Sequence, residues 1–258
     1  MVATKGATMA EKMTYGGNWV IVGYKGAKPG RAVENFSAYI QPADAPTGVA
    51  VKYWELPTEP LKKDLKVGQK LWRSDASFYF SDKGGVGIDG DYALVGDYGK
   101  NNVSVYRWHD SQWQLQQEIL PKSRQGGNFG ISTDISGNLA IVGRSGATVS
   151  DKTKCGAADI YEFKGGQWQH QQILQPSDLK TQDYFGSSVA IDSKKAIVGV
   201  WSADAPGKEN CGAAYIFHLE NGKWVQKAKL QPLDLGASDR LGISVAIVAF
   251  TLTNCKIS

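Results

Sequence analysis

This 258-residue chain has few groups that could carry acid–base, nucleophilic or metal chemistry. They are three histidines, three cysteines and 25 acidic side chains. His109, His170 and His218 fall on different predicted strands or turns, and no nucleophile motif lies beside them. The sequence contains no GxSxG, HExxH or Walker-type loop. Carboxylates distant in sequence can still meet in a fold, so a hydrolase with paired carboxylates is the catalytic alternative. We expect a protein that is not an enzyme.

Metal-binding patterns are also missing. Cys155, Cys211 and Cys255 show neither CxxC nor Cys/His spacing, so we expect free thiols rather than a zinc site or a disulfide framework. Calcium loops of the type DxDxDG, which surround a hard cation with oxygen ligands, do not occur. Asp89 and Asp91 flank a glycine before a predicted strand, which favours a β-turn. We therefore expect no metal and no cofactor, with calcium as the alternative.

Ligand contacts are a more promising chemistry, because Tyr98 and Trp201 follow strands of the type A-x-V-G and charged side chains lie in the equivalent loops. Such positions fall in the variable loops between strands, where a rigid scaffold commonly presents binding residues. Aromatic rings there could stack on sugars, and charges could pair with a protein partner. The alternative is that they are ordinary solvent-exposed loop residues. The candidates are Asp97, Tyr98, Arg144, Trp201, Asp204 and Lys208.

An internal repeat positions these loops. The glycines of its Phe-Gly or Leu-Gly step lie 56 residues apart (186 − 130 and 242 − 186), and a shorter copy precedes them. Tryptophans recur at one position of each copy, which favours a packing role over ligand binding. A fixed period of this length indicates a repeat architecture. The predicted structural residues are Phe129, Gly130, Phe185, Gly186, Gly242, Trp113, Trp168 and Trp224.

One copy predicts four strands, at residues 186–191, 195–200, 213–217 and 223–230, separated by turn-forming residues. The first three carry small or branched apolar residues on both faces, whereas the fourth alternates apolar and polar residues. Such a sheet is buried at one edge and exposed at the other. No helical pattern intervenes, so the sequence predicts an all-β fold, a β-propeller of four-stranded antiparallel blades.

The pattern F-G-x-S-V-A-I-D, then A-I-V-G, G-A-A-Y-I-F, W and L-Q-P-x-D resembles the FG-GAP repeats of integrin-α-like propellers. The resemblance is closest over residues 185–239, weaker over 129–183, and weakest over 81–127. It implies a propeller that recognises or adheres to proteins or glycans, mostly outside the cell, through loops on one face. Some fungal lectins have similar repeats, and many relatives bind calcium on loops that this sequence lacks.

The repeats divide the chain into a tail at 1–17 and a single propeller domain at 18–258, with blades at 79–128, 129–184 and 185–240. The divergent blade at 18–78 has no predicted opening strand, because the strand at 18–23 resembles the second strand of a blade. The sequence therefore predicts that residues 241–258 complete that blade and close a ring of four to five blades. The alternative is an open fragment that forms a homo-oligomer.

Composition limits the partners. The net charge of +4 is dispersed, so we expect no nucleic-acid binding. No run approaches the roughly 18 apolar residues of a membrane helix, and residues 1–17 lack the apolar region of a signal peptide, so the compartment is not assigned. We expect a recognition or adhesion domain that binds a protein partner, because the loop residues Tyr98, Ser145 and Trp201 differ between blades. A carbohydrate-binding lectin is the alternative.

Overall fold

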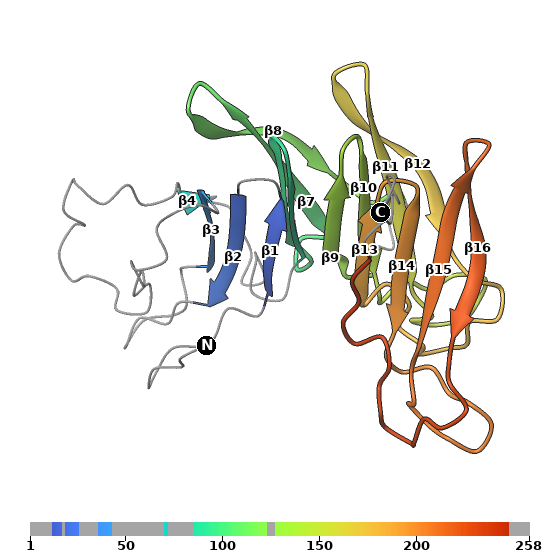
Figure 1. The fold of residues 1–258 in the computed structure, drawn as a ribbon. Coiled ribbons are helices and arrows are strands. Elements are labelled where there is room, and N and C mark those ends of the chain that lie inside the picture. The colour runs from blue at the N-terminus through green and yellow to red at the C-terminus, as the bar shows by residue number, and fades with distance from the viewer. Residues whose placement is uncertain are drawn as a thin grey trace, which may run out of the picture.

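The computed structural model describes residues 85–122 and 127–247 in full, together with the backbone of four strands closer to the N-terminus. Each of its four sheets has four antiparallel strands that follow one another in chain order (Figure 1). The described residues include no helix that could cross a membrane. The predicted all-β architecture of four-stranded antiparallel blades is confirmed.

The strands closely match the expected ones in the repeat region. The first sheet contains β1 (Lys12–Gly16), β2 (Trp19–Lys25), β3 (Phe36–Pro42) and β4 (Lys70–Leu71). The second contains β5 (Val86–Asp89), β6 (Tyr92–Asp97), β7 (Asn102–His109) and β8 (Gln112–Ile119). The third contains β9 (Phe129–Ser136), β10 (Leu139–Arg144), β11 (Ala157–Lys164) and β12 (Gln167–Leu174). The fourth contains β13 (Ser188–Asp192), β14 (Lys195–Val200), β15 (Ala213–Glu220) and β16 (Lys223–Leu230).

The N-terminal sheet differs from the expected composite blade. β1 pairs antiparallel with β2, so a strand within the predicted tail takes the place that we assigned to residues 241–258. The register pairs Gly16 with Trp19, which leaves Gly17 and Asn18 as the connection. The N-terminal sheet therefore takes its opening strand from residues that precede β2. Residues 248–258 lie outside the described residues, and the described residues 241–247 form no strand.

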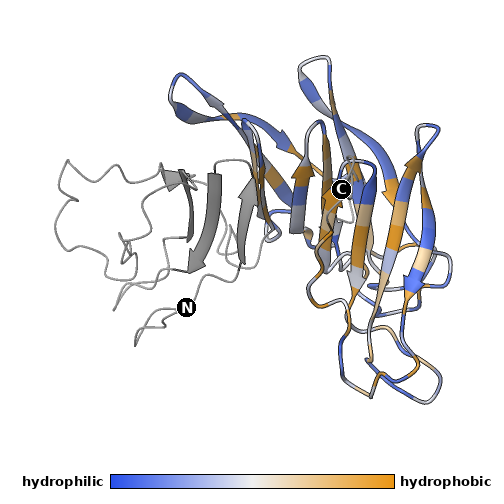
Figure 2. Cartoon of the chain, viewed as in Figure 1, coloured by the Kyte–Doolittle hydropathy of each residue, from blue (hydrophilic) through white to orange (hydrophobic). Residues whose placement is uncertain are grey.

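The first strands of the sheets, β1, β5, β9 and β13, lie side by side in that order. Burial falls from these inner strands to the outer ones: Val86–Ile88 in β5 are buried, whereas β8, β12 and β16 are mostly exposed. In the fourth sheet, hydrophobic residues run along β13, β14 and β15, whereas hydrophilic residues gather at the hairpin tips and along part of β16 (Figure 2). This gradient is the one that the strand patterns predict.

The core lies between neighbouring sheets rather than within one sheet. One buried cluster joins Ile141 and Leu174 of the third sheet to Val198 and Tyr215 of the fourth. A second joins the second and third sheets around Phe129. Each sheet therefore needs its neighbour to bury its apolar faces, as repeat units do.

The Phe-Gly step holds successive sheets together. Phe185 is fully buried, and Gly186 has a φ of 86°, in the left-handed region that favours glycine. A Cβ on Gly186 would lie 2.2 Å from the Ala157 carbonyl oxygen, and one on Gly143 would lie 2.0 Å from the Gly186 carbonyl oxygen. The two glycines of the repeat thus meet across the junction between sheets. Any side chain at either position would separate the two sheets.

Buried tryptophans take part in the same junctions. Gln172 donates its Nε2 to the Trp224 carbonyl oxygen (2.8 Å), and its Oε1 accepts from the Trp224 amide (2.9 Å). Gln117 makes the same pair of bonds to Trp168 (2.9 and 2.8 Å). Trp113, Trp168 and Trp224 are at most 5% exposed, as their packing role requires.

Candidate functional site

The predicted contact loops gather at one end of the described sheets. In a four-stranded antiparallel sheet, the connection from the second to the third strand lies at the same end as the connection to the next sheet. These connections are 98–101, 145–156 and 201–212 within sheets, and 175–187 after β12. The long ones extend from the lower end of the sheets in Figure 1. We call this end, with residues 231–247, the loop end.

The six predicted residues divide between buried strand ends and loops. Asp97 and Arg144 end β6 and β10 and are each 2% exposed. Tyr98, Trp201 and Lys208 are partly exposed in the loops, and Asp204 is exposed. A partner therefore could not reach the side chains of Asp97 and Arg144, which corrects the expectation for these two.

Arg144 belongs to a buried charge cluster that sequence reasoning missed. Its Nε lies 3.1 Å from Asp159 Oδ2, and His170 Nε2 lies 3.0 Å from Asp159 Oδ1. The rings of His170 and Tyr161 pack edge to face, and the Tyr161 hydroxyl donates to the Leu120 carbonyl oxygen (3.2 Å). Burial, followed by the charge of Asp159, raises the pKa of Tyr161, so its hydroxyl stays protonated. The cluster links three strands of the third sheet and presents no nucleophile.

Lys208 and Asp204 fix the loop between β14 and β15. Lys208 Nζ donates to the Leu233 carbonyl oxygen (2.8 Å), and Lys152, 56 residues earlier, donates to the carbonyl oxygens of Ser177 and Leu179 (3.0 and 2.6 Å). Asp204 Oδ1 accepts from the Asn210 amide (2.8 Å). These two side chains hold the backbone of the loop end, and their contacts favour a supporting role.

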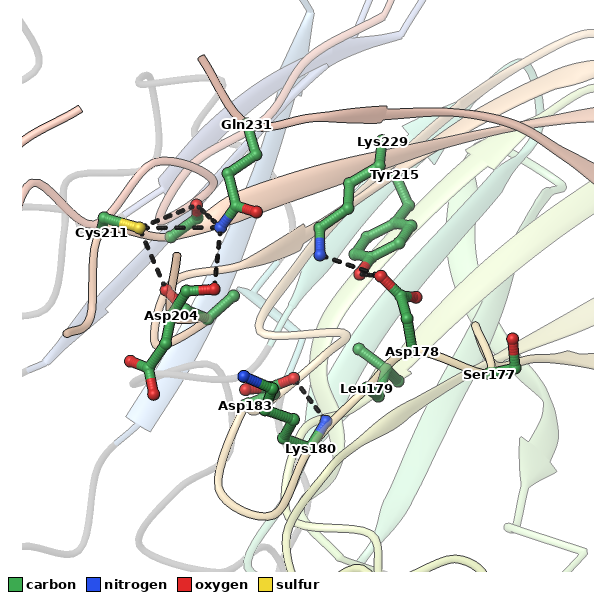
Figure 3. Close-up of polar contacts among 12 residues, drawn as sticks. Ser177, Asp178, Leu179, Lys180, Asp183, Asp204, Cys211, Tyr215, Lys229 and Gln231 are labelled. Atoms are coloured by element: carbon green, nitrogen blue, oxygen red, sulfur yellow. Dashed lines mark hydrogen bonds and ion pairs between the residues drawn. The ribbon is translucent and has the colours of Figure 1, made fainter. Parts of the chain in front are cut away.

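A second set of contacts anchors the connections between sheets (Figure 3). Asp178 Oδ2 accepts from the Tyr215 hydroxyl and from Lys229 Nζ, each at 2.9 Å. Gln231 Nε2 donates to the carbonyl oxygens of Asp204 (3.3 Å) and Gly212 (3.1 Å). Side-chain hydrogen bonds therefore join the short segments of the loop end to one another and to β15 and β16.

Trp201 is the centre of a partly exposed aromatic group at this end. Its ring stacks on Tyr184 with centroids 5.4 Å apart and planes 15° apart, and the Arg240 guanidinium lies over it at 5.3 Å. Tyr184 and Arg240 were not among the predicted residues. Each precedes the Phe-Gly or Leu-Gly step, 56 residues apart (240 − 184), and each has a positive φ. That shared position was the signal that could have found them.

The described residues offer little to a metal ion. They contain no group of three or more His, Cys, Asp or Glu side chains that could hold one. Asp89 accepts from the Gly137 amide (2.6 Å), and Gly90 and Asp91 form the turn between β5 and β6, as predicted. Cys155 and Cys211 are buried free thiols, also as predicted, and Cys255 lies outside the described residues.

Comparison with known families identifies the repeat. The FG-GAP repeat family matches residues 168–217, from the end of the third sheet into β15 of the fourth. The chain therefore contains an FG-GAP repeat, and the resemblance drawn from the sequence pattern is confirmed. Comparison with curated proteins finds no match.

One solved structure supports the fold. "Kuenenia stuttgartiensis Hydrazine Synthase" aligns with 89% of this chain and 51% of its own at 13% identity and a TM-score of 0.50. The N-terminal domain of Nup159 aligns over 86% of this chain and 49% of its own at 11% identity, with a TM-score of 0.44. Saccharomyces cerevisiae Sqt1 aligns over 60% of this chain and 38% of its own at 12% identity, with a TM-score of 0.38. The chain thus spans about half or less of the length of these structures. The similarity to hydrazine synthase bears on the fold alone.

Proposed function

We propose that this chain is a non-enzymatic recognition domain that binds a protein partner through its loop end. The observation that carries the proposal is the group formed by Tyr184, Trp201 and Arg240, which is at least partly exposed on loops with fixed backbones. Tyrosine, tryptophan and arginine are the residue types that dominate binding energy at protein interfaces. Arg240 forms no ion pair with a described residue, so an acidic group of a partner could pair with it.

Pre-organisation supports the same proposal. The bonds from Lys208 to Leu233, from Ser202 to the Gln182 carbonyl oxygen (2.8 Å) and from Asn210 to Asp204 hold the loop around Trp201. A loop ordered before binding loses little conformational entropy when a partner docks. Binding energy from the partly exposed Trp201 ring is then available for affinity.

A glycan is the second candidate, because the partly exposed Trp201 ring could stack on a sugar. A lectin with several equivalent pockets would repeat its contact residues, yet Ser145 stands at the position equivalent to Trp201 (201 − 56). This difference between sheets favours one asymmetric surface and hence a protein partner.

The proposal assigns no catalytic role and no cofactor. His170 and Asp159 are the described pair nearest to an acid–base arrangement, but Asp159 is fully buried and also pairs with Arg144. His109 and Asp110 are exposed neighbours at a hairpin tip. These surroundings favour a structural role for the first pair and a solvent-exposed role for the second. Calcium remains the alternative cofactor, and adding a chelator to the binding assay tests it.

The test is affinity capture with the immobilised full chain, followed by reconstitution with the purified captured protein. Trp201→Ala should weaken binding by about 30-fold or more, as expected for an interface hot spot. Trp108→Ala is the matched control, because Trp108 is a partly exposed tryptophan near the β7–β8 hairpin, at the opposite end of the sheets. A glycan array probed with the same three proteins tests the lectin. Binding that survives Trp201→Ala unchanged, or glycan binding lost with it, would overturn the protein-partner proposal.

A further inference from the structure

The hairpin between β15 and β16 turns on two residues, Asn221 and Gly222. The strand register pairs Glu220 with Lys223, and φ is 49° at Asn221 and 77° at Gly222. Positive φ at both central residues is the conformation of a type I′ turn, for which Asn-Gly is a favoured sequence. Both residues are exposed, and apart from the chain neighbours no described atom lies within 4 Å of a Cβ placed on Gly222. The turn therefore holds an asparagine followed by a glycine in solvent.

The other described asparagines have different surroundings, because each is followed by a buried residue. These following residues are Asn102, Val103, Phe129, Leu139 and Cys211. Asn138 is the closest counterpart of Asn221, since it is exposed in the turn between β9 and β10, at the same end of the sheets. Its side-chain amide donates to Glu162 Oε1 (3.3 Å), and the next residue is the buried Leu139. Asn221 thus differs from them in having an exposed glycine next to it.

This arrangement matters because the side-chain amide of an asparagine is open to attack by the backbone nitrogen of the next residue. The Gly222 nitrogen would bond to Asn221 Cγ and lose its proton, and the side-chain nitrogen would leave as ammonia. The product is a five-membered succinimide ring, which water opens at either of its two carbonyl groups. One opening gives aspartate, and the other gives isoaspartate, in which the main chain runs through the side-chain carbon. A glycine favours the attack, because it has no side chain to crowd its nitrogen.

We propose that Asn221 is a site of spontaneous deamidation, with water as the co-reactant, and that isoaspartate at this position loosens the β15–β16 hairpin. Ring closure requires the Asn221 side chain and the Gly222 nitrogen to lie on the same side of the Cα–C bond, and a type I′ turn keeps them apart. The reaction therefore proceeds when the tip of the hairpin opens. Opening costs little there, because the tip is exposed and β16 is the edge strand of its sheet.

The two products would affect the hairpin differently. Aspartate adds a negative charge beside Glu220, which already pairs with Lys227 (2.7 Å), but Asp-Gly is also a favoured type I′ sequence and keeps the turn. Isoaspartate adds a carbon to the main chain, so the turn no longer matches the pairing of Glu220 with Lys223. The hairpin lies at the opposite end of the sheets from the loop end, so this proposal is independent of the proposed function.

The test is incubation of the purified full chain at mildly alkaline pH, followed by peptide mass spectrometry that separates aspartate from isoaspartate. Both products should accumulate at position 221, with isoaspartate in excess, while Asn138 stays intact as the internal control. The folded chain should react about 5–30-fold more slowly than the same chain unfolded in urea, because a hairpin tip opens at a small cost in free energy.

Hydrogen exchange tests the effect on the hairpin. Residues 219–225 of the incubated chain should lose protection, whereas Asn221→Asp, which has the charge without the extra carbon, should keep the protection of the wild type. The proposal is overturned if the folded chain keeps Asn221 intact while the unfolded chain loses it, if Asn138 reacts equally fast, or if aspartate forms without isoaspartate. Equal protection in the incubated chain and in Asn221→Asp would overturn the predicted loosening.

Discussion

Gln172 shows how much one side chain contributes to the junction between two sheets. Its amide group makes two hydrogen bonds to the backbone of Trp224 in the next sheet, and Gln117 repeats this contact one sheet earlier. The equivalent residue of β16 is Ala228 (172 + 56), which cannot form such bonds. The glutamine therefore occurs in β8 and β12, and the sheet that follows each of them contains the tryptophan that it bonds.

Replacement of Gln172 by Ala should lower the free energy of unfolding by about 1–3 kcal/mol, because a partly buried amide and carbonyl of Trp224 lose their partners. Urea unfolding measures this change. Gln171→Ala is the control, since Gln171 is exposed one residue away and should change stability by less than about 0.5 kcal/mol. Equal effects of the two substitutions would contradict the contribution of the bonds to Trp224.

The Phe-Gly step can be tested in the same way. Gly186→Ala should cost about 2–5 kcal/mol, because the residue has a positive φ and its new Cβ would meet the Ala157 carbonyl oxygen. Gly222 also has a positive φ, but nothing lies within 4 Å of the Cβ position. Gly222→Ala should therefore cost only about 1–2 kcal/mol. Thermal unfolding of both variants separates the steric part of the stability loss from the conformational part. A loss for Gly222→Ala as large as that for Gly186→Ala would argue against close packing at Gly186.

At the scale of elements, Asp178 ties the connection after β12 to β15 and β16. Burial alone would raise the pKa of Asp178, but hydrogen bonds from Lys229 and Tyr215 and the charge of Lys229 outweigh it, so the pKa is lowered. A carboxyl group whose pKa is lower in the folded protein than in the unfolded chain stabilises the fold. This stabilisation is fully present at pH values above the pKa of the unfolded chain. This stability is lost as the pH falls through the folded value.

Asp178→Asn should therefore destabilise the protein most at neutral pH, and the difference from wild type should shrink as the pH falls below about 4. Chemical unfolding at a series of pH values measures it. Asp234→Asn is the matched control, because Asp234 stands at the equivalent position after β16 (178 + 56) and is exposed. A gap between wild type and Asp178→Asn that widens in acid would show that the contacts do not favour the carboxylate.

For the whole molecule, the second, third and fourth sheets form a row in which neighbours pack on each other through shared cores. Stability in such a row is approximately the sum of the stabilities of single sheets and of the junctions between them. Weakening one junction should therefore uncouple the sheets on its two sides.

We expect Gln172→Ala combined with Asp178→Asn to let β13–β16 unfold at a lower urea concentration than β5–β12. Hydrogen exchange followed by mass spectrometry, read peptide by peptide across the urea series, would report each sheet separately. The wild type should lose protection in both regions together. Coincident loss in the double variant would mean that the junction carries little of the cooperativity.

The strands, the repeat and the family resemblance were predictable from the sequence, because they depend on local patterns. Alternation in β16, apolar runs in β14 and the glycines of the Phe-Gly step depend on periodicity and on backbone conformation, which short stretches of chain encode. The opening strand β1 was missed, since five residues with mixed polarity give little periodicity.

Burial and the grouping of side chains depended on tertiary structure. Arg144 and Asp97 resemble loop residues in the sequence, yet neighbouring strands enclose them. Tyr184, Trp201 and Arg240 come together only because three connections that are distant in the sequence meet at the loop end. The Ser-Val-Ala-Ile stretch, which occurs twice, is the clearest case, being a mostly buried strand at 188–191 and exposed or partly exposed at 244–247. Identical residues differ there because the burial of a strand is a property of the sheets beside it, which no local sequence contains.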